Sequence, residues 1–265
     1  MPMEIEKEYF LADLSLKCCQ TDKAIFHYKR VLKMKVENKM YISREDLEKL
    51  EEYYIEIISK LIKIAEDNRR EEATLMNQSE IRILRRHTFE LENELENIFN
   101  DALGYFNTFD GHFTKPEMKA YLWKMKADFL RSKAKTFGIQ NLKNAISLAI
   151  SYYKTATSLL ETNSWLCPYK LDVFFNFLRL KTLLDPSDIH YDVLTDKYEF
   201  AFLNSDSVKN DWKYFNDILR SMNVFLNKKR NVHEVTLEAL ICNKYQSEFM
   251  HIVSRKEYLK SYYFF

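Results

Sequence analysis

The stretch of sequence that decides the fold is SREDLEKLEEYYIEIISKLIKIA, residues 43–65. Its apolar residues recur at spacings of three and four, which places them on one face of an α-helix. Ser43 stands three residues before Asp46, as in a capping box with Asp in place of Glu, so we expect the helix to begin there. The apolar face consists of Leu47, Leu50, Tyr54, Ile57, Ile58, Leu61 and Ala65. This pattern predicts a long helix that packs along one side.

A second run of the same kind starts at Ser79. Its apolar positions are again separated by charged residues, and they include Ile83, Phe89, Leu91, Leu95, Ile98, Phe99 and Leu103. Residues 43–106 therefore predict an antiparallel hairpin of two long helices that turns near Asn77.

Eight further helices are expected from the same periodicity and from helix start signals. Gly occurs 3 times and Pro 4 times in 265 residues, so the chain lacks the turn residues of an all-β fold or a Gly-rich nucleotide loop. Thr114 with Glu117, and Asn231 with Glu234, have capping-box spacing. The expected ranges are 4–19, 22–35, 115–137, 140–161, 168–184, 189–203, 207–226 and 232–260. Because no linker interrupts this series, we predict an all-α fold of antiparallel helices in one domain.

The charge balance and the cysteines indicate which partners and which cellular compartment to expect for this chain. Lys and Arg total 40 against 39 Asp and Glu, so the net charge of +1 gives no global attraction to nucleic acid or to an anionic membrane. Any anion site has to be local. The first residues resemble no leader peptide and no run approaches about 18 apolar residues, so we expect a cytoplasmic protein without a membrane partner. We expect reduced, mostly buried thiols at Cys18, Cys19, Cys167 and Cys242.

No group of residues has the spacing of a catalytic or metal site. The six histidines are scattered singly, so we expect no enzymatic activity, no metal and no cofactor. The segment YLWKMKADFLR, residues 121–131, is different, because it places Lys124, Asp128 and Arg131 on one helical face at spacings of four and three. A carboxylate between two cations can hold a guanidinium with its donors directed at an incoming oxyanion.

Residues 121–131 also resemble the fifth helix of the 14-3-3 family, which has the pattern Y-L-K-M-K-G-D-Y-x-R-Y. Residues 168–184, PYKLDVFFNFLRLKTLL, are similar to the family's seventh helix. Residues 95–103 resemble the end of its fourth helix, and residues 218–220 resemble part of its ninth. The order of these segments agrees with the family's nine-helix layout. The resemblance therefore implies a 14-3-3-like array of about nine antiparallel helices.

In this family a groove between helices three, five, seven and nine binds peptides that contain phosphoserine or phosphothreonine. The resemblance implies that Arg131 binds the phosphate, that Lys124 supports it, and that Asn176 holds the peptide backbone. The chain would then be a noncatalytic adaptor whose partners are phosphorylated client proteins.

Several phosphate-binding positions of the family differ in this chain, so we expect an altered or weakened pocket. The Tyr that follows the helix-five Arg is replaced by Ser132. In an ungapped alignment the helix-three Lys and Arg positions are Ile55 and Ile62. A register shifted by about two turns places Lys63 and Arg70 there instead, and both registers stay open.

Two other functions are weighed against the phosphopeptide adaptor. The first is a helical scaffold of the same fold that binds unphosphorylated protein partners through apolar residues such as Phe175 and Ile218. The second is a helical enzyme with an unrecognised site, which the absence of catalytic spacing disfavours.

The two ends of the chain also depart from the family. Family members dimerise through helix one against helices three and four, but Cys19 and Gln20 replace charged residues of that junction, so a homodimer through the N-terminal helices stays open. We divide the chain into a 14-3-3-like domain, residues 1–227, and a C-terminal extension, residues 228–265, packed on it. The extension is predicted to form a tenth helix because of an amphipathic stripe of Leu237, Leu240, Ile241, Tyr245, Phe249, Ile252 and Val253.

Overall fold

The computed structural model describes residues 2–138, 142–184, 191–208 and 211–230. Within these ranges every regular element is a helix and there is no β-strand, which confirms the all-α prediction. The elements are α1 (Pro2–Lys17), α2 (Thr21–Glu37), α3 (Arg44–Glu72), α4 (Gln78–Asn107), α5 (Pro116–Phe137), α6 (Lys143–Leu159), α7 (Pro168–Leu184), α8 (Tyr191–Leu203), the short 3-10 helix η2 (Ser205–Ser207) and α9 (Trp212–Arg230).

The chain divides into two compact units, Met1–Tyr152 and Tyr153–Phe265, with the boundary inside α6. The predicted single domain over residues 1–227 stays a prediction. The predicted tenth helix, residues 232–260, lies outside the described residues.

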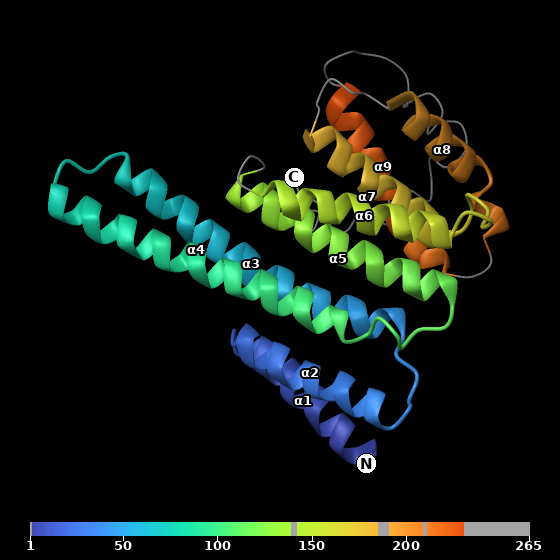
Figure 1. Ribbon diagram of the computed structural model, residues 1–265, viewed down its shortest axis with the longest axis horizontal. Helices are drawn as coiled ribbons and strands as arrows, with labels where there is room; N and C mark the ends of the chain where they lie inside the picture. Colours follow the sequence, from blue (N-terminus) through green and yellow to red (C-terminus); the bar gives the residue numbers. More distant parts are fainter. Residues whose placement is uncertain (1, 139–141, 185–190, 209–210, 231–265) are drawn as a thin grey trace, which may run out of the picture. The chain divides into compact units, whose positions relative to one another are not determined.

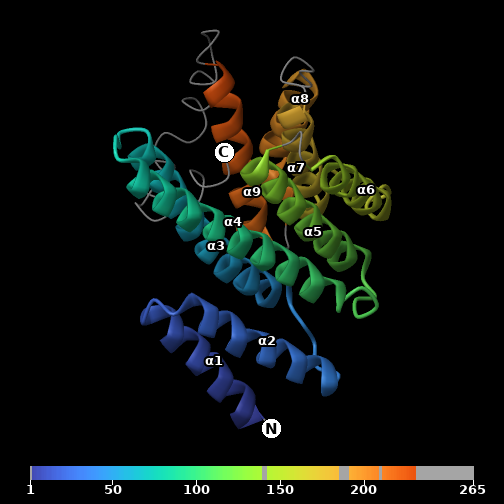
Figure 2. The same cartoon turned by 60° about the vertical axis from the view of Figure 1, so that its left-hand side comes forward.

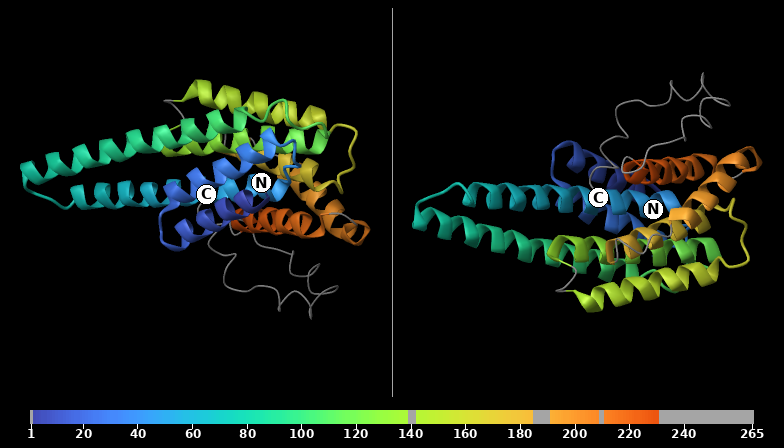
Figure 3. Two further views of the ribbon diagram at one scale, coloured as in Figure 1. Left: turned by 90° about the horizontal axis from the view of Figure 1, so that it is seen from below. Right: turned by 90° about the horizontal axis from the view of Figure 1, so that it is seen from above.

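In the first unit α1 packs against α2, α2 packs against α3, and α3 and α4 form the long hairpin that the sequence predicts (Figure 1). Helix α5 contacts both α3 and α4, and it runs beside α4 in Figure 2. The core between these helices is aromatic, since the Phe129 ring of α5 lies 5.9 Å from Tyr54 of α3 and 5.5 Å from Phe106 of α4. The loop end of the hairpin, around residues 73–77, extends past α1, α2 and α5 (Figures 1 and 3).

The helix ends test the predicted start signals. The capping box of α3 is confirmed, because the Asp46 backbone N–H donates to the Ser43 hydroxyl over 3.2 Å and the Ser43 N–H donates to the Asp46 carboxylate over 2.9 Å. The predicted turn is also confirmed, since Asn77 caps α4 by accepting from the Ser79 N–H over 3.0 Å. The predicted Thr114 cap is wrong. Helix α5 starts one residue later than that cap requires, with Lys115 at the N-cap, no side-chain cap bond, and Pro at N1.

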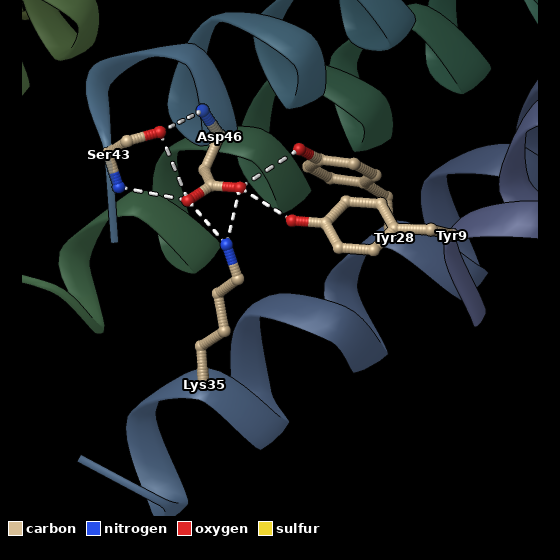
Figure 4. A network of polar contacts seen from close by, with 5 residues as sticks. All are labelled: Tyr9, Tyr28, Lys35, Ser43 and Asp46. Atoms are coloured by element: carbon tan, nitrogen blue, oxygen red, sulfur yellow. Dashed lines mark hydrogen bonds and ion pairs between the residues drawn. The ribbon is translucent and has the colours of Figure 1, made fainter. Parts of the chain in front are cut away.

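The Asp46 carboxylate joins three helices of the first unit (Figure 4). Beyond its capping role in α3, it accepts from the Tyr9 hydroxyl of α1 over 2.7 Å and pairs with the Lys35 ammonium of α2 over 2.7 Å. Tyr28 of α2 donates to the same carboxylate over 3.5 Å. Burial works against the charge of Asp46, but the hydrogen bonds from Lys35 and Tyr9 hold its pKa below the ordinary value.

In the second unit α9 packs against α7 and α8. The Phe175 ring of α7 lies 5.7 Å from Phe225 of α9, and Tyr153, in the second half of α6, stacks on Phe177 at 5.5 Å. The helix predicted over residues 207–226 starts later than expected, because residues 205–207 form η2 and α9 begins at Trp212.

The prediction of mostly buried cysteines is wrong for the described residues. Cys18 and Cys19 are exposed and Cys167 is half-buried, each as a free thiol. The first two follow the end of α1, where Cys19 has a φ of 58°. Two adjacent cysteines in such a turn cannot both face the core. The apolar periodicity of the sequence predicted a helix through Cys19 and so did not reveal this turn. Cys242 lies outside the described residues.

Candidate functional site

Helix α5 brings Lys124, Asp128 and Arg131 together on one face. The Lys124 ammonium lies 2.9 Å from one carboxylate oxygen of Asp128, and the Arg131 guanidinium lies 2.9 Å from the other. This is the arrangement predicted from the spacing of four and three, because residues so spaced meet on a helix. We call these three residues the α5 triad.

The α5 triad is largely shielded from solvent, with 12%, 7% and 8% of the Lys124, Asp128 and Arg131 side chains exposed. Leu122 and Met125 of the same helix are also buried, so this part of α5 lies in the interior of the protein. Between groups that are shielded from water, the attraction of a carboxylate for its cations is stronger. Removing one partner leaves an uncompensated charge and destabilises the folded protein. The Lys124 ammonium also lies 5.6 Å from the centre of the Tyr121 ring, which attracts cations through its face.

The charges of the α5 triad sum to one excess positive charge, from two cations and one carboxylate. A guanidinium carries five N–H donors and an ammonium carries three, whereas the carboxylate only accepts. Asp128 therefore fixes the direction of both cations. Such an arrangement can attract an anion with several acceptor oxygens.

The helix-three residues of the alternative register lie on the surface of the first unit. Lys63 is exposed on α3. Arg69 pairs with Glu92 of α4 over 2.5 Å, and Arg70 pairs with Asp67 over 3.3 Å. Exposed ion pairs of this kind contribute roughly 0 to 1 kcal/mol to stability. A more highly charged anion would therefore displace these carboxylates from the arginines.

Ile55 and Ile62 are the helix-three residues of the ungapped register. Both are half-buried, and they lie about two turns apart on α3. Neither can bind a phosphate, and both leave apolar surface partly open to solvent.

Asn176 belongs to a different network, inside the second unit. Its amide nitrogen donates to the Asp172 carboxylate over 2.7 Å and to the Asp172 carbonyl over 3.1 Å, while its amide oxygen accepts from Arg179 over 3.2 Å. The Tyr214 hydroxyl of α9 donates to the other Asp172 oxygen over 2.5 Å. Sequence reasoning missed Asp172 and Tyr214. The signal was Asp172, the single acidic residue of α7, four residues before Asn176.

Sequence reasoning also missed two buried lysines of α5. Lys126 is fully buried, pairs with Asp110, and lies 4.5 Å from the centre of the Trp123 ring. Lys133 is buried and donates to Glu96 and Asn100 of α4 over 3.0 and 2.9 Å. Because both ammonium groups bind acceptors outside α5, these two lysines stabilise the packing of α5 against α4 and the loop that follows it.

Two comparisons with known proteins bear on this chain. No protein-family model matches it, and no curated protein matches it. Among the described residues, no group of three or more His, Cys, Asp and Glu side chains could hold a metal ion. The search of those same residues for a membrane-spanning helix found none with the required length and apolar character.

Proposed function

We propose that this chain is a noncatalytic adaptor of the 14-3-3 type that binds phosphoserine or phosphothreonine peptides of cytoplasmic client proteins. Arg131 is the main phosphate ligand in this proposal and Lys124 supports it. The observation that carries the proposal is the α5 triad, in which one carboxylate orients both cations at 2.9 Å. The all-helical fold supports it more generally.

The phosphate group matches the chemistry of the α5 triad. A phosphorylated side chain brings close to two negative charges and three acceptor oxygens. A guanidinium recognises such a group through two parallel hydrogen bonds, and each charge-assisted bond contributes roughly 1.5 to 3 kcal/mol. An unmodified hydroxyl offers a single neutral acceptor, so the triad should discriminate in favour of the phosphorylated peptide.

The pocket should be weaker than one with four convergent phosphate ligands. Ser132 stands where the family has a Tyr, and in the ungapped register Ile55 and Ile62 replace two cations. Losing both of these charge-assisted bonds reduces affinity by about two or more powers of ten. Asn176 is proposed as the ligand of the peptide backbone, and to act so it has to exchange a contact with Asp172 or Arg179.

The test is a titration of a labelled phosphopeptide library and of the same library after dephosphorylation. We expect binding of the phosphorylated peptides and its loss in Arg131→Gln and in Lys124→Gln. Lys23→Gln is the matched control, because it removes an exposed lysine of α2. Circular dichroism checks that each variant keeps its helices. Unchanged binding in a folded Arg131→Gln variant would reject Arg131 as the ligand.

A scaffold that binds unphosphorylated partners is the second candidate. It is favoured by Ile55 and Ile62, which leave apolar surface where the resemblance places two cations. The residues first suggested for it are unsuitable, because Phe175 and Ile218 are 3% and 4% exposed and belong to the core of the second unit. Equal affinity for both forms of one peptide would favour the scaffold over the phosphopeptide adaptor.

A further inference from the structure

The turn between α1 and α2 contains two adjacent cysteines that the packing of the first unit does not explain. Cys18 and Cys19 are free thiols, and both residues are exposed. Cysteine is among the most often buried residue types, because its side chain behaves as a small hydrophobic group. Neither residue fills space in the core, so what the two contribute at the surface is their thiol chemistry.

The backbone holds the two cysteines in a defined turn. The Cys19 N–H donates to the Leu16 carbonyl over 2.9 Å. The Gln20 N–H donates to the Ser15 carbonyl, also over 2.9 Å. These two hydrogen bonds form the Schellman arrangement that closes a helix, and Cys19 is its left-handed residue, with a φ of 58°. Glycine is the usual residue in this conformation, because a Cβ atom is unfavourable there, so the turn has a cysteine where the backbone favours a glycine.

Adjacent cysteines are poorly placed for a disulfide with each other. Consecutive Cα atoms are about 3.8 Å apart, whereas the Cα atoms of a disulfide usually lie about 4.4 to 6.8 Å apart. A metal ion between two thiolates removes this conflict. Because a metal–thiolate bond is about 2.3 Å long, as for zinc, the two sulfurs can lie up to about 4.5 Å apart. The geometry of the turn therefore favours a shared metal ion over a bond between the sulfurs.

The number of ligands at the turn indicates which ion fits. Within the described part of the chain, no group of three or more His, Cys, Asp and Glu side chains could hold a metal ion, so the two thiols have no third ligand of these types beside them. Zinc takes four ligands in structural sites, and two thiolates do not meet that need. Cu(I) is a soft ion that thiolates select, and two sulfurs on opposite sides of it complete its coordination.

We propose that Cys18 and Cys19 bind one Cu(I) ion between their thiolates. Each thiol gives up its proton on binding, so the site releases two protons and has one net negative charge when the ion is bound. The expected absence of a metal site rests on the spacings of zinc-type ligands, which a pair of adjacent thiolates does not follow. This site is on the α1–α2 turn and the α5 triad is on another helix, so it does not depend on the proposed peptide binding.

The test is a competition for Cu(I) between the full chain and bicinchoninate, whose copper complex is coloured, under nitrogen with ascorbate as the reductant. We expect the unchanged chain to remove one Cu(I) per molecule and to bleach the complex. Cys18→Ser and Cys19→Ser should each weaken the binding of Cu(I) at least about a hundredfold, because even a change in the groups around a metal ligand costs about ten- to a hundredfold. Zn(II) should bind at least about a hundredfold more weakly than Cu(I), since only two of its four ligands are present.

Two control variants each remove a thiol elsewhere in the chain. They are Cys167→Ser and Cys242→Ser, and both should remove Cu(I) from bicinchoninate like the unchanged chain. Circular dichroism verifies folding. The two substitutions in the turn should leave the helices intact, because both residues are exposed.

Four results would overturn the proposal. The first is a coloured complex that the unchanged chain does not bleach. The second is Cu(I) binding that survives Cys18→Ser/Cys19→Ser, or that Cys167→Ser or Cys242→Ser removes. The third is one Cu(I) for every two chains, which would assign the ion to thiols of different molecules. The fourth is an equal affinity for Zn(II), which would mean that an ion with four ligands is held.

Discussion

Asp46 is the residue on which the N-terminal helices most depend. It combines a cap of α3, an ion pair with Lys35 and a hydrogen bond from Tyr9, and it is 6% exposed. We expect Asp46→Asn to lower the free energy of unfolding by about 3 kcal/mol, because Lys35 would lose its charged partner in a shielded place. Asp13→Asn is the matched control. Its pair with Lys49 is largely exposed, so the loss should be roughly 0.5 kcal/mol. Urea unfolding measures both.

The same prediction has a pH dependence. The pKa of Asp46 is lower in the folded protein than in the unfolded chain, so its stabilisation is present above the unfolded value, about 3.9. That stabilisation is lost as the pH falls through the folded pKa. The unfolding free energy should therefore drop more steeply below about pH 4 in the unchanged protein than in Asp46→Asn. Parallel curves for the two proteins would contradict this role of Asp46.

At the residue scale, local sequence geometry predicted some pairs and could not predict others. Lys124, Asp128 and Arg131 were predictable as a group because helical spacing alone brings them together. Lys35 and Asp46 lie on different helices, and no spacing rule connects them. Their contact follows from how α2 packs on α3, which depends on the whole unit.

At the element scale, α4 has one face in the core and another in solvent. Phe99 is fully buried, and its ring lies 6.5 Å from Phe129 and 6.3 Å from Phe137 of α5. We expect Phe99→Ala to destabilise the protein by about 4 kcal/mol, because it leaves a cavity among these rings. Phe89→Ala, ten residues earlier on the exposed face, should change stability by less than about 0.5 kcal/mol. Thermal unfolding compares them, and equal losses would contradict the assigned faces of α4.

The helices themselves were largely predictable, and their ends were less so. The hairpin of α3 and α4 followed from a strong period and from the cap at Ser43, since both signals are local. Thr114 failed as a cap because Pro116 starts α5 without one. The sequence also could not show that Ile83 and Phe89 point outward while Leu91 points inward. Each fits an apolar period, and only the packing partners decide which of them is covered.

At the scale of the whole molecule, the described surface includes a feature through which two copies of the chain could associate. Helix α1 presents Met3, Phe10 and Leu14 to solvent at spacings of seven and four, which places them on one face. The resemblance to 14-3-3 proteins suggests that two copies meet through the N-terminal helices. The charge near zero at neutral pH opposes such association only weakly.

A homodimer through the N-terminal helices stays a prediction. If its contact includes Phe10, Phe10→Asp should raise the dissociation constant by about a hundredfold, because a carboxylate cannot be buried in an apolar contact without a partner. Phe200→Asp is the matched control, since Phe200 is exposed on α8 and outside the N-terminal helices. Sedimentation equilibrium over a range of concentrations measures both variants. A monomer at every concentration would mean that the apolar face of α1 serves another partner. A dimer that tolerates Phe10→Asp would move the contact to a different surface, because burial of Phe10 is what this arrangement requires.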